Sequence, residues 1–405
     1  MRLTVKEKKK LTAVMAPEYQ RARKKEKGNI LEQFIKATRY NRCYAAHVLR
    51  TQGKKTWINP RTRLVSDVRR RTKREKERIY DDAVATTLTQ VWKMMDYICG
   101  KRLAPLLKEV IPRLIRFGEI TLPLEAKDKL MRISPATIDR LLASERKKYT
   151  IKGRANTKPG TLLKNQIPIR TFSQWDDKRP GFVEIDLVGH DGGDGSGDFL
   201  QTLDVTDVAT GWTETQAVRN KAQQWVFEAL KDIRGRLPFP LLGIDSDNGG
   251  EFINNHLYRY CQEEKITFTR TRSYRKNDNC FVEQKNYSVV RRAVGYGRHT
   301  TQEEQAVLND LYKELRLFTN FFQPSMKLIK RTREGSRVVK TYDKPLTPYR
   351  RILASADVSD SDKSELKALY RNLNPAALNR KITKHQQRLL RLNAAKQGGR
   401  KRSAA

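Results

Sequence analysis

Three acidic residues lie in settings that favour metal-dependent chemistry. Asp186 is inside the apolar run FVEIDLV, Asp247 follows an apolar strand in IDSDNGGEF, and Glu283 lies near the start of an expected helix in NDNCFVEQKN. An unpaired charge in an apolar strand is costly to bury, so a cation is the natural partner of Asp186. Phosphodiester chemistry commonly uses two divalent ions held by carboxylates. The pattern predicts a site for two Mg²⁺ or Mn²⁺ ions, provided that the fold brings the three acids together.

Neighbouring acids offer alternatives for these roles. Asp245 lies on the same face of the same expected strand as the second acid, and Glu263 and Glu264 occur in the helix before the third. Asp204 and Asp207, in TLDVTDVATGW, either support the metal ligands or simply end a strand. Residue pattern alone leaves the roles of these last two acids open.

The surrounding pattern predicts a sheet that positions the acids. FVEIDLV, FLQTLDVTDV and WTETQAV follow one another closely and suit an antiparallel meander. A helix at KAQQWVFEALKDIR, the strand LLGID, a helix at residues 251–264, the strand ITFTRTR and a helix from Asn279 then alternate. The sheet is therefore mixed, with helices on its faces. Gly249 and Gly250 are expected to turn the chain sharply beside Asp247, at the strand end where open sheets bind ligands.

Three stretches carry a family resemblance. FVEIDLV, IDSDNGGEF and YRKNDNCFVEQKN, with 35 residues between Asp247 and Glu283, resemble the catalytic core of DDE transposases and retroviral integrases, as found in insertion-sequence transposases. The resemblance spans roughly residues 175–300. It implies an α/β ribonuclease H-like core with a mixed five-stranded sheet, in which Asp186, Asp247 and Glu283 are the catalytic residues and bind two Mg²⁺ ions. Water would nick a transposon end, and the freed 3′-hydroxyl would attack target DNA.

The sequence departs from this family pattern at two places. Related cores often carry a Lys or Arg one or two turns after the glutamate, whereas Tyr287 and Val290 stand four and seven residues after Glu283. Contacts to DNA phosphates are therefore assigned to Lys285 and Arg291. The His/His/Cys/Cys zinc domain that begins retroviral integrases is also missing, and the four scattered cysteines are expected to be reduced.

The N-terminal segment has the outline of a helix-turn-helix. In GNILEQFIKATRYNRCYAAHVLR, two amphipathic stretches at helical spacing flank a short polar break. Asn41 and Arg42 would open the second helix and contact DNA. Any other helical hairpin would give the same pattern.

Charge is distributed unevenly along the chain. The formal net charge is +38, yet residues 175–300 hold 17 Lys and Arg against 19 Asp and Glu, so the flanking arms carry the positive charge. Such arms favour double-stranded DNA as the partner. The expected segments are a helix-turn-helix region with a basic linker (1–80), a second helical DNA-binding region (81–150), a linker (151–174), the core (175–300), a helix with a basic hairpin or small barrel (301–378), and a basic tail disordered at its end (379–405).

Two details support the outer segments. In MRISPATIDRLLA, Ser134 is suited to cap a helix that begins at Pro135. No apolar run is long enough for a membrane span or a signal peptide, so we expect a cytoplasmic, nucleoid-associated protein of bacterial type without a membrane partner.

The combined pattern predicts a DNA transposase. Its partners would be transposon terminal inverted repeats and target DNA, and holding two ends together requires a homo-oligomer, at least a dimer on DNA. A ribonuclease H-like nuclease or resolvase that only hydrolyses DNA is the enzymatic alternative. A DNA-binding regulator built on a degenerate core is the other alternative, although no acid of the triad is missing.

Overall fold

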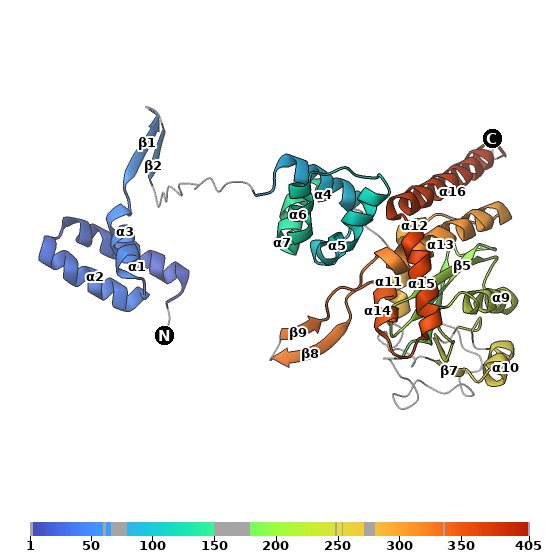
Figure 1. Cartoon of the computed structure of the whole chain (residues 1–405). Coiled ribbons are helices and arrows are strands. Elements are labelled where there is room, and N and C mark those ends of the chain that lie inside the picture. The colour runs from blue at the N-terminus through green and yellow to red at the C-terminus, as the bar shows by residue number, and fades with distance from the viewer. Residues whose placement is uncertain are drawn as a thin grey trace. The chain divides into compact units, whose positions relative to one another are not determined.

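The computed structural model describes residues 3–59, 62–65, 79–149, 179–247, 249–252, 254–270, 280–334 and 337–403 (Figure 1). The chain forms two compact units, Met1–Arg78 and Ile79–Ala405, and each is described by itself. The expected linker at 151–174 lies outside the described residues.

The first unit is a small helical bundle followed by a hairpin. Its elements are α1 (Val5–Arg21), α2 (Lys24–Thr38), α3 (Arg42–Thr51), β1 (Lys55–Asn59) and β2 (Thr62–Val65). Phe34 and Leu49 are fully buried in the core of the bundle. The Asn41 side chain accepts a hydrogen bond from Tyr44 N at 2.8 Å, so the predicted start of the helix at Arg42 is confirmed. The antiparallel β1–β2 pair lies where a basic linker was predicted, and residues 66–78 are outside the described part.

The second unit begins with a block of short helices. They are α4 (Asp82–Met94), α5 (Gly100–Arg116), α6 (Leu124–Arg132), α7 (Pro135–Leu141), α8 (Ala143–Arg146) and a 3₁₀ turn at Lys147–Tyr149. The Ser134 hydroxyl accepts from Thr137 N at 3.2 Å and Pro135 opens α7, as the sequence predicted.

A mixed five-stranded sheet follows this helical block. Its strands are β3 (Phe182–Gly189), β4 (Gln201–Asp207), β5 (Thr213–Val218), β6 (Gly243–Ser246) and β7 (Thr267–Arg270). They are ordered β5-β4-β3-β6-β7, with the first three antiparallel and β6 and β7 parallel to β3. This arrangement confirms the predicted meander and the ribonuclease H-like core.

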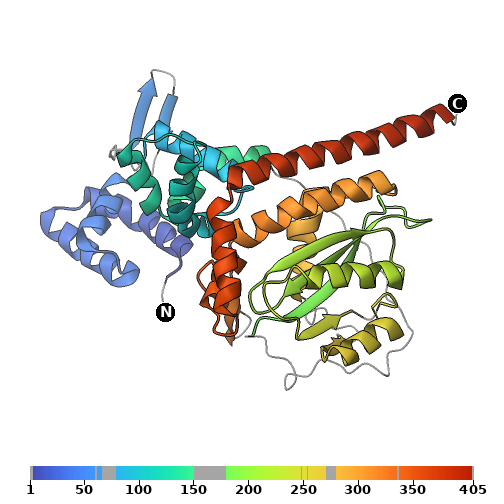
Figure 2. The same ribbon diagram turned by 45° about the vertical axis from the view of Figure 1, so that its right-hand side comes forward.

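The two faces of the sheet differ in polarity because side chains alternate along each strand. Val183, Ile185 and Leu203 are buried on the face covered by α9 (Gln223–Arg234) and α10 (Asn255–Glu263). Figure 2 shows α9 lying across the sheet. The opposite face carries the acids. The helix predicted at 251–264 begins later, because the Asn254 side chain caps α10 by accepting from Leu257 N at 2.8 Å.

Further helices follow the last strand of the sheet in the sequence. A continuous helical segment consists of α11 (Cys280–Lys285), the π-helical η2 (Asn286–Arg291) and α12 (Arg292–Val294). After it come α13 (Gln302–Phe322), the hairpin strands β8 (Leu328–Glu334) and β9 (Arg337–Tyr342), α14 (Pro348–Ala354), α15 (Asp360–Asn372) and α16 (Pro375–Ser403).

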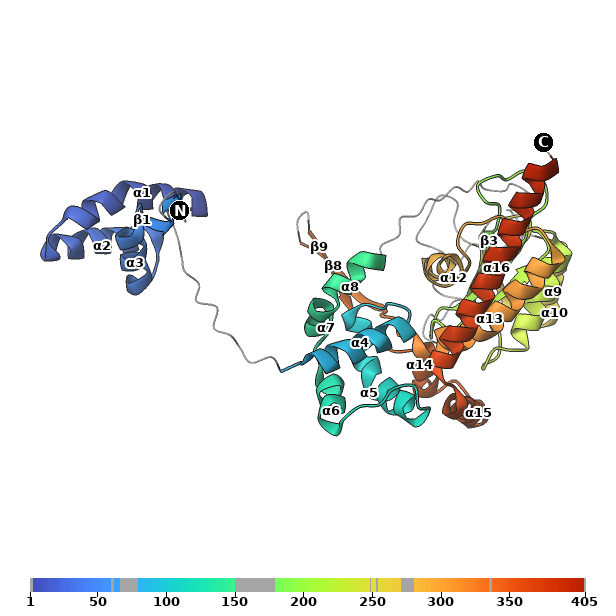
Figure 3. The same ribbon diagram turned by 90° about the horizontal axis from the view of Figure 1, so that it is seen from above.

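The C-terminal region differs from two expectations. The predicted boundary at 378/379 falls inside α16, and this helix continues to Ser403 where a disordered end was expected. Buried Ile382 and Leu389 pack it against α13, beside which it runs in Figure 3. Among the described strands, β8 and β9 pair only with each other, so they form a hairpin and not a barrel. No described helix has the length and apolar character needed to cross a membrane.

The helical block and the C-terminal helices share one hydrophobic core. Leu107 and Val110 of α5 belong to the same buried cluster as Phe321 of α13. Arg113 donates to the carbonyl of Tyr370 at 2.7 Å, and its guanidinium lies 3.9 Å from the centre of that ring. Residues 82–146 are therefore packed onto the C-terminal helices of the same unit by apolar contacts that the sequence pattern did not indicate.

A buried asparagine joins α13 to the edge of the sheet. The Asn320 side chain accepts from Thr213 N and donates to Thr213 O, both at 2.9 Å, and it is fully buried. Asn320→Ala leaves these two backbone groups without partners, so we expect the free energy of unfolding to fall by about 2–4 kcal/mol. Denaturant unfolding measures this loss. Asn372→Ala, at an exposed position of α15, is the matched control and should change stability by less than about 0.5 kcal/mol; equal effects would contradict the assignment.

Candidate active site

Asp186 and Asp247 are brought side by side by the parallel pairing of β3 with β6. Ile185 is paired with Ser246, and each aspartate is the next residue of its strand or strand end. Side chains of paired residues point to the same face of a sheet. The competing Asp245 is paired with Glu184, two positions before Asp186, and its carboxylate accepts from Thr269 Oγ1 at 2.6 Å in a fully buried setting. Asp247 is thus the aspartate of β6 that adjoins Asp186.

Asp186 is oriented by two hydrogen bonds. Its Oδ1 accepts from Leu187 N at 2.8 Å, and its Oδ2 accepts from Asn286 Nδ2 at 2.6 Å. Burial first, and then the negative charges of Asp247 and Glu283, raise the pKa of Asp186 to about 7 against the lowering effect of these hydrogen bonds. The charged form of this carboxylate is therefore costly without a cation.

Asp247 is held by a close turn. Its Oδ1 accepts from Gly249 N at 2.9 Å, and burial raises its pKa. A Cβ on Gly249 would lie 2.7 Å from the Glu251 carboxyl group and 2.9 Å from Asp247 Oδ1. A side chain at position 249 would therefore displace these two carboxylates. The turn expected from sequence is present, since Phe252 N donates to the Gly249 carbonyl at 3.1 Å, and it needs no positive φ at Gly249 or Gly250.

Glu283 is carried by α11, whose start is fixed by another acid. The buried carboxylate of Glu184 accepts from Phe281 N at 2.8 Å and Val282 N at 3.1 Å, at the positive end of the helix. The Glu283 side chain is exposed, and its charge acts on the pKa of Asp186. Asp247 and Glu283 thus both lie within electrostatic range of Asp186.

The donor set suits hard divalent cations. Asp186 and Asp247 supply carboxylate oxygens, the ligands that Mg²⁺ prefers, and burial with like charge makes their joint ionisation unfavourable without a cation. Among the described residues, no three acidic, His or Cys side chains stand close enough to hold one ion. Asp186, Asp247 and Glu283 therefore do not form a ready three-ligand group among these residues, although the chemistry of the aspartates suits such an ion.

The acids left open by the sequence have different surroundings. Asp204 lies directly opposite Asp186 across β3 and β4, is fully buried, and has an Oδ2 without a hydrogen-bond partner in the described chain. Burial raises its pKa to about 8, against the nearby charge of Lys285. Asp207 instead accepts from Gly181 N at 2.8 Å and Thr210 N at 2.7 Å, and it closes the turn after β4. Asp207 is therefore a strand-end acid, whereas Asp204 lies beside Asp186 on the same face of the sheet.

The residues predicted to contact DNA have intramolecular partners. Burial lowers the pKa of Lys285 to about 8, and its ammonium interacts with the charge of Asp204. Arg291 donates to the Gly189 carbonyl at 2.8 Å and lies 5.0 Å from the Tyr296 ring centre. In the first unit, Arg42 lies 3.8 Å from Glu32 in an exposed ion pair. Their contacts with DNA, and those of Asn41, stay predictions.

Three residues at the site were missed by sequence reasoning. Glu184 shares the face of Asp186 because it stands two residues earlier in the strand, a signal that the period of two contained. Asn286 follows Glu283 by one helical turn, and Glu251, whose pKa is raised by burial and by Asp247, follows the glycine turn. Their roles depend on contacts between segments far apart in sequence.

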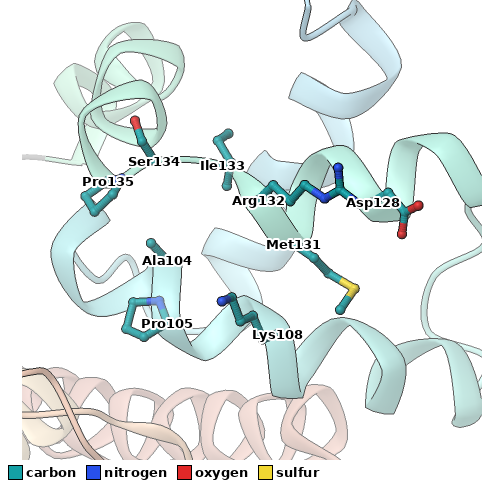
Figure 4. A pocket seen from close by; sticks show the side chains of 9 residues that line it. All are labelled: Ala104, Pro105, Lys108, Asp128, Met131, Arg132, Ile133, Ser134 and Pro135. Carbon is teal, nitrogen blue, oxygen red and sulfur yellow. The ribbon is translucent and has the colours of Figure 1, made fainter.

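A groove lies apart from the carboxylates, in the helical block (Figure 4). It has a volume of about 730 Å³ and includes the cationic side chains of Lys108 and Arg132. The other lining residues are Ala104, Pro105, Asp128, Met131, Ile133, Ser134 and Pro135.

The chain resembles a protein of known sequence over most of its length. No protein-family model matches the chain. The uncharacterized protein y4rM of Sinorhizobium fredii (strain NBRC 101917 / NGR234) is 39% identical over 352 residues, which are 86% of this chain and 96% of that protein.

Solved structures similar to this chain include two integrase cores. The catalytic core domain of BIV integrase is 17% identical with a TM-score of 0.29, over 43% of this chain and 94% of that one. The HTLV-2 integrase catalytic core, in complex with magnesium in a dimeric form, is 13% identical with a TM-score of 0.28, over 37% and 93%. The ribonuclease H-like fold is assigned from the strand order β5-β4-β3-β6-β7 of this chain.

The raised pKa of Asp186 predicts a pH-dependent stability without divalent ions. Between the ordinary value of 3.8 and about 7, the folded protein holds a proton that the unfolded chain has released, so stability falls as pH rises through this window. Asp186→Asn removes this contribution. In EDTA, the difference in free energy of unfolding between Asp186→Asn and wild type should shift in favour of the variant by on the order of 1–3 kcal/mol from pH 4 to pH 8. Denaturant unfolding at several pH values tests this, with exposed Asp198→Asn as control; parallel profiles for wild type and Asp186→Asn would contradict it.

Proposed function

We propose that this chain, which belongs to the same protein family as the y4rM protein of Sinorhizobium fredii, is a DNA transposase. The observation that carries the proposal is that Asp186 and Asp247 directly follow the paired residues Ile185 and Ser246 of two adjacent parallel strands, beside the helix of Glu283. Together with the ribonuclease H-like strand order, this arrangement supports polynucleotidyl transfer better than any other reaction.

The three acids would hold two Mg²⁺ or Mn²⁺ ions. When bound, such ions neutralise charge on the phosphate oxygens and activate the attacking oxygen. The protein's own contribution is to position ligands. Asn286 and Leu187 N orient the Asp186 carboxylate, and Glu184 fixes the start of the helix that carries Glu283.

The proposed reaction has two displacement steps of the same kind. A water oxygen attacks the phosphorus at a transposon end and gives up a proton, the bond to the leaving 3′-oxygen breaks, and that oxygen takes up a proton. The freed 3′-hydroxyl then loses its proton as it attacks a phosphorus of target DNA, and the displaced oxygen takes up a proton as it leaves. Neither step forms a covalent enzyme intermediate, so positioning and charge neutralisation supply the catalysis.

DNA binding is assigned to the positively charged segments outside the core. Residues 175–300 are nearly neutral in sequence, whereas the remaining chain holds 66 Lys and Arg against 26 Asp and Glu. We propose that the α2–α3 pair, through Asn41 and Arg42, reads the terminal inverted repeats, and that the groove with Lys108 and Arg132 contacts phosphates. Joining two ends to one target implies at least a dimer on DNA. The setting would be cytoplasmic and nucleoid-associated.

A cleavage and joining assay tests the proposed chemistry. The substrates are duplexes carrying candidate end sequences and a supercoiled target, with Mg²⁺. We expect wild type to cut and join, and Asp247→Asn and Glu283→Gln to lose both steps while still binding DNA, because a carboxamide removes a charged metal ligand. Glu263→Gln, an exposed acid of α10, is the matched control and should keep both activities.

The outcomes of this assay separate the alternatives. Joining that survives Asp247→Asn would overturn the assignment of the site. Cutting without joining by wild type would point to a nuclease of the same fold. Loss of activity in Glu263→Gln would show that charge removal acts indirectly.

A second prediction concerns the orientation of Asp186. Asn286→Ala removes the 2.6 Å hydrogen bond to its carboxylate, so we expect the cleavage rate to fall roughly 10- to 100-fold at saturating DNA. DNA affinity should stay within about twofold, because the bond acts on a ligand and not on DNA. Ser288→Ala, exposed on the same helical segment, is the control. A change confined to affinity would refute the positioning role.

A further inference from the structure

The β8–β9 hairpin is clamped at its base. Lys327 N donates to Asp343 Oδ1 at 2.6 Å, and Asp343 N donates to Lys327 O at 2.9 Å. The other carboxylate oxygen of Asp343 accepts from Arg351 at 2.7 Å, and this arginine also donates to the Ser325 carbonyl at 3.0 Å. The two strands therefore leave the body of the unit in a defined direction, as a separate ribbon in Figure 1.

The base of the hairpin lies beside the helix of Glu283. The Lys327 ammonium is 6.0 Å from the centre of the Phe281 ring, and it donates to the carbonyls of Val208 and Ala209 after β4. Phe281 stands two residues before Glu283, and its backbone N–H binds Glu184. The hairpin thus starts next to the candidate active site.

The two faces of the ribbon differ in exposure near its tip. Thr332 is paired with Val339, and both are half-buried, although the next pair on that face, Lys330 and Thr341, is exposed. The opposite face carries the pair Arg333 and Val338, followed along β9 by Lys340, and all three are exposed. Near the base this face continues with Tyr342 (46% exposed) and its partner Leu328 (48%).

The charge and shape of the hairpin suit duplex DNA. Its strands hold five Lys and Arg and one Glu, which complements a line of phosphates. The major groove of B-DNA admits a two-stranded β-ribbon. Apolar side chains interleaved with the cations offer surface to sugars and thymine methyl groups, and exposed apolar patches rimmed by polar groups mark interaction sites. A two-stranded hairpin is marginally stable alone, so a bound partner would order it.

We propose that the β8–β9 hairpin is a DNA-binding arm that enters a groove of the duplex next to the phosphate that is cut. The proposal rests on the proposed function, since it places the arm on the same DNA. It assigns the exposed face with Arg333, Val338 and Lys340 to the duplex. A second copy of this chain is the competing occupant of that face.

Site-specific photocrosslinking tests the occupant directly. The photoreactive residue p-benzoylphenylalanine replaces Val338 in the full-length chain, and the matched control carries it at Leu369 of α15, which is equally exposed at 40%. The probe is a fluorescent duplex of arbitrary sequence. We expect irradiation to attach the duplex at position 338 at least about tenfold more than at position 369.

Each outcome of the crosslinking experiment supports or refutes DNA as the partner of the hairpin. If the chain binds the duplex but position 338 attaches no more DNA than position 369, the arm assignment fails and the proposed function stands. Attachment of position 338 to a second chain instead of DNA would also overturn it. If wild type binds no duplex, the proposed function and the arm fail together.

Charge reversal provides an independent measurement. Arg333→Glu with Lys340→Glu should weaken duplex binding by roughly tenfold or more, and the slope of log affinity against log salt should become shallower by about 2, because two phosphate contacts are lost. The control, Lys367→Glu with Arg371→Glu on α15, makes the same change in net charge at exposed positions. Equal losses in the two double variants would mean that net charge alone governs binding and would refute the arm.

Discussion

The repulsion between Asp186 and Asp247 is the constraint on which the rest of the structure depends. Two carboxylates on adjoining strands would separate in a flexible chain, but parallel β pairing holds them one register step beyond Ile185 and Ser246. Burial adds to the free-energy cost of ionising both carboxylates, since it is the main cause of the raised pKa of each. The fold tolerates this arrangement because the opposite face of the same sheet packs an apolar core against α9 and α10.

The helix that carries Glu283 is held at three points along its length. Glu184 binds the backbone at its start, and Asn286 joins its middle to Asp186. At its far end, Arg292 pairs with Asp96 at 2.8 Å, and the Ala293 carbonyl accepts from Gln386 of α16 at 2.8 Å. The N-terminal helical block and the C-terminal helix therefore both support the placement of the third acid. The π-helical turn at Asn286–Arg291 belongs to this segment, and such turns are frequent at functional sites.

Charge is divided between two tasks in this protein. The acids of the core lie on one polar face, and residues 175–300 have almost no net charge. The core therefore offers little general electrostatic attraction for DNA. Lys285 illustrates the division, because its ammonium lies near buried Asp204 and offsets that charge. Cationic side chains at exposed positions are found elsewhere, including Arg333 and Lys340 of the β8–β9 hairpin. The side chains suited to attract DNA and the carboxylates suited to bind metal thus lie on different elements.

The sequence by itself determined the order of strands and helices in the core, because periodicity and apolar strands are local properties. Its motif spacing predicted which three acids form the site. The sequence also located the caps at Asn41 and Ser134. Only the tertiary structure separated Asp247 from Asp245, turned Lys285 inward, and revealed Glu184 and Asn286 as partners of the site. It likewise converted the expected basic tail into a helix packed on α13. These features depend on pairing register and on contacts between segments distant in the chain, and no local pattern encodes either one.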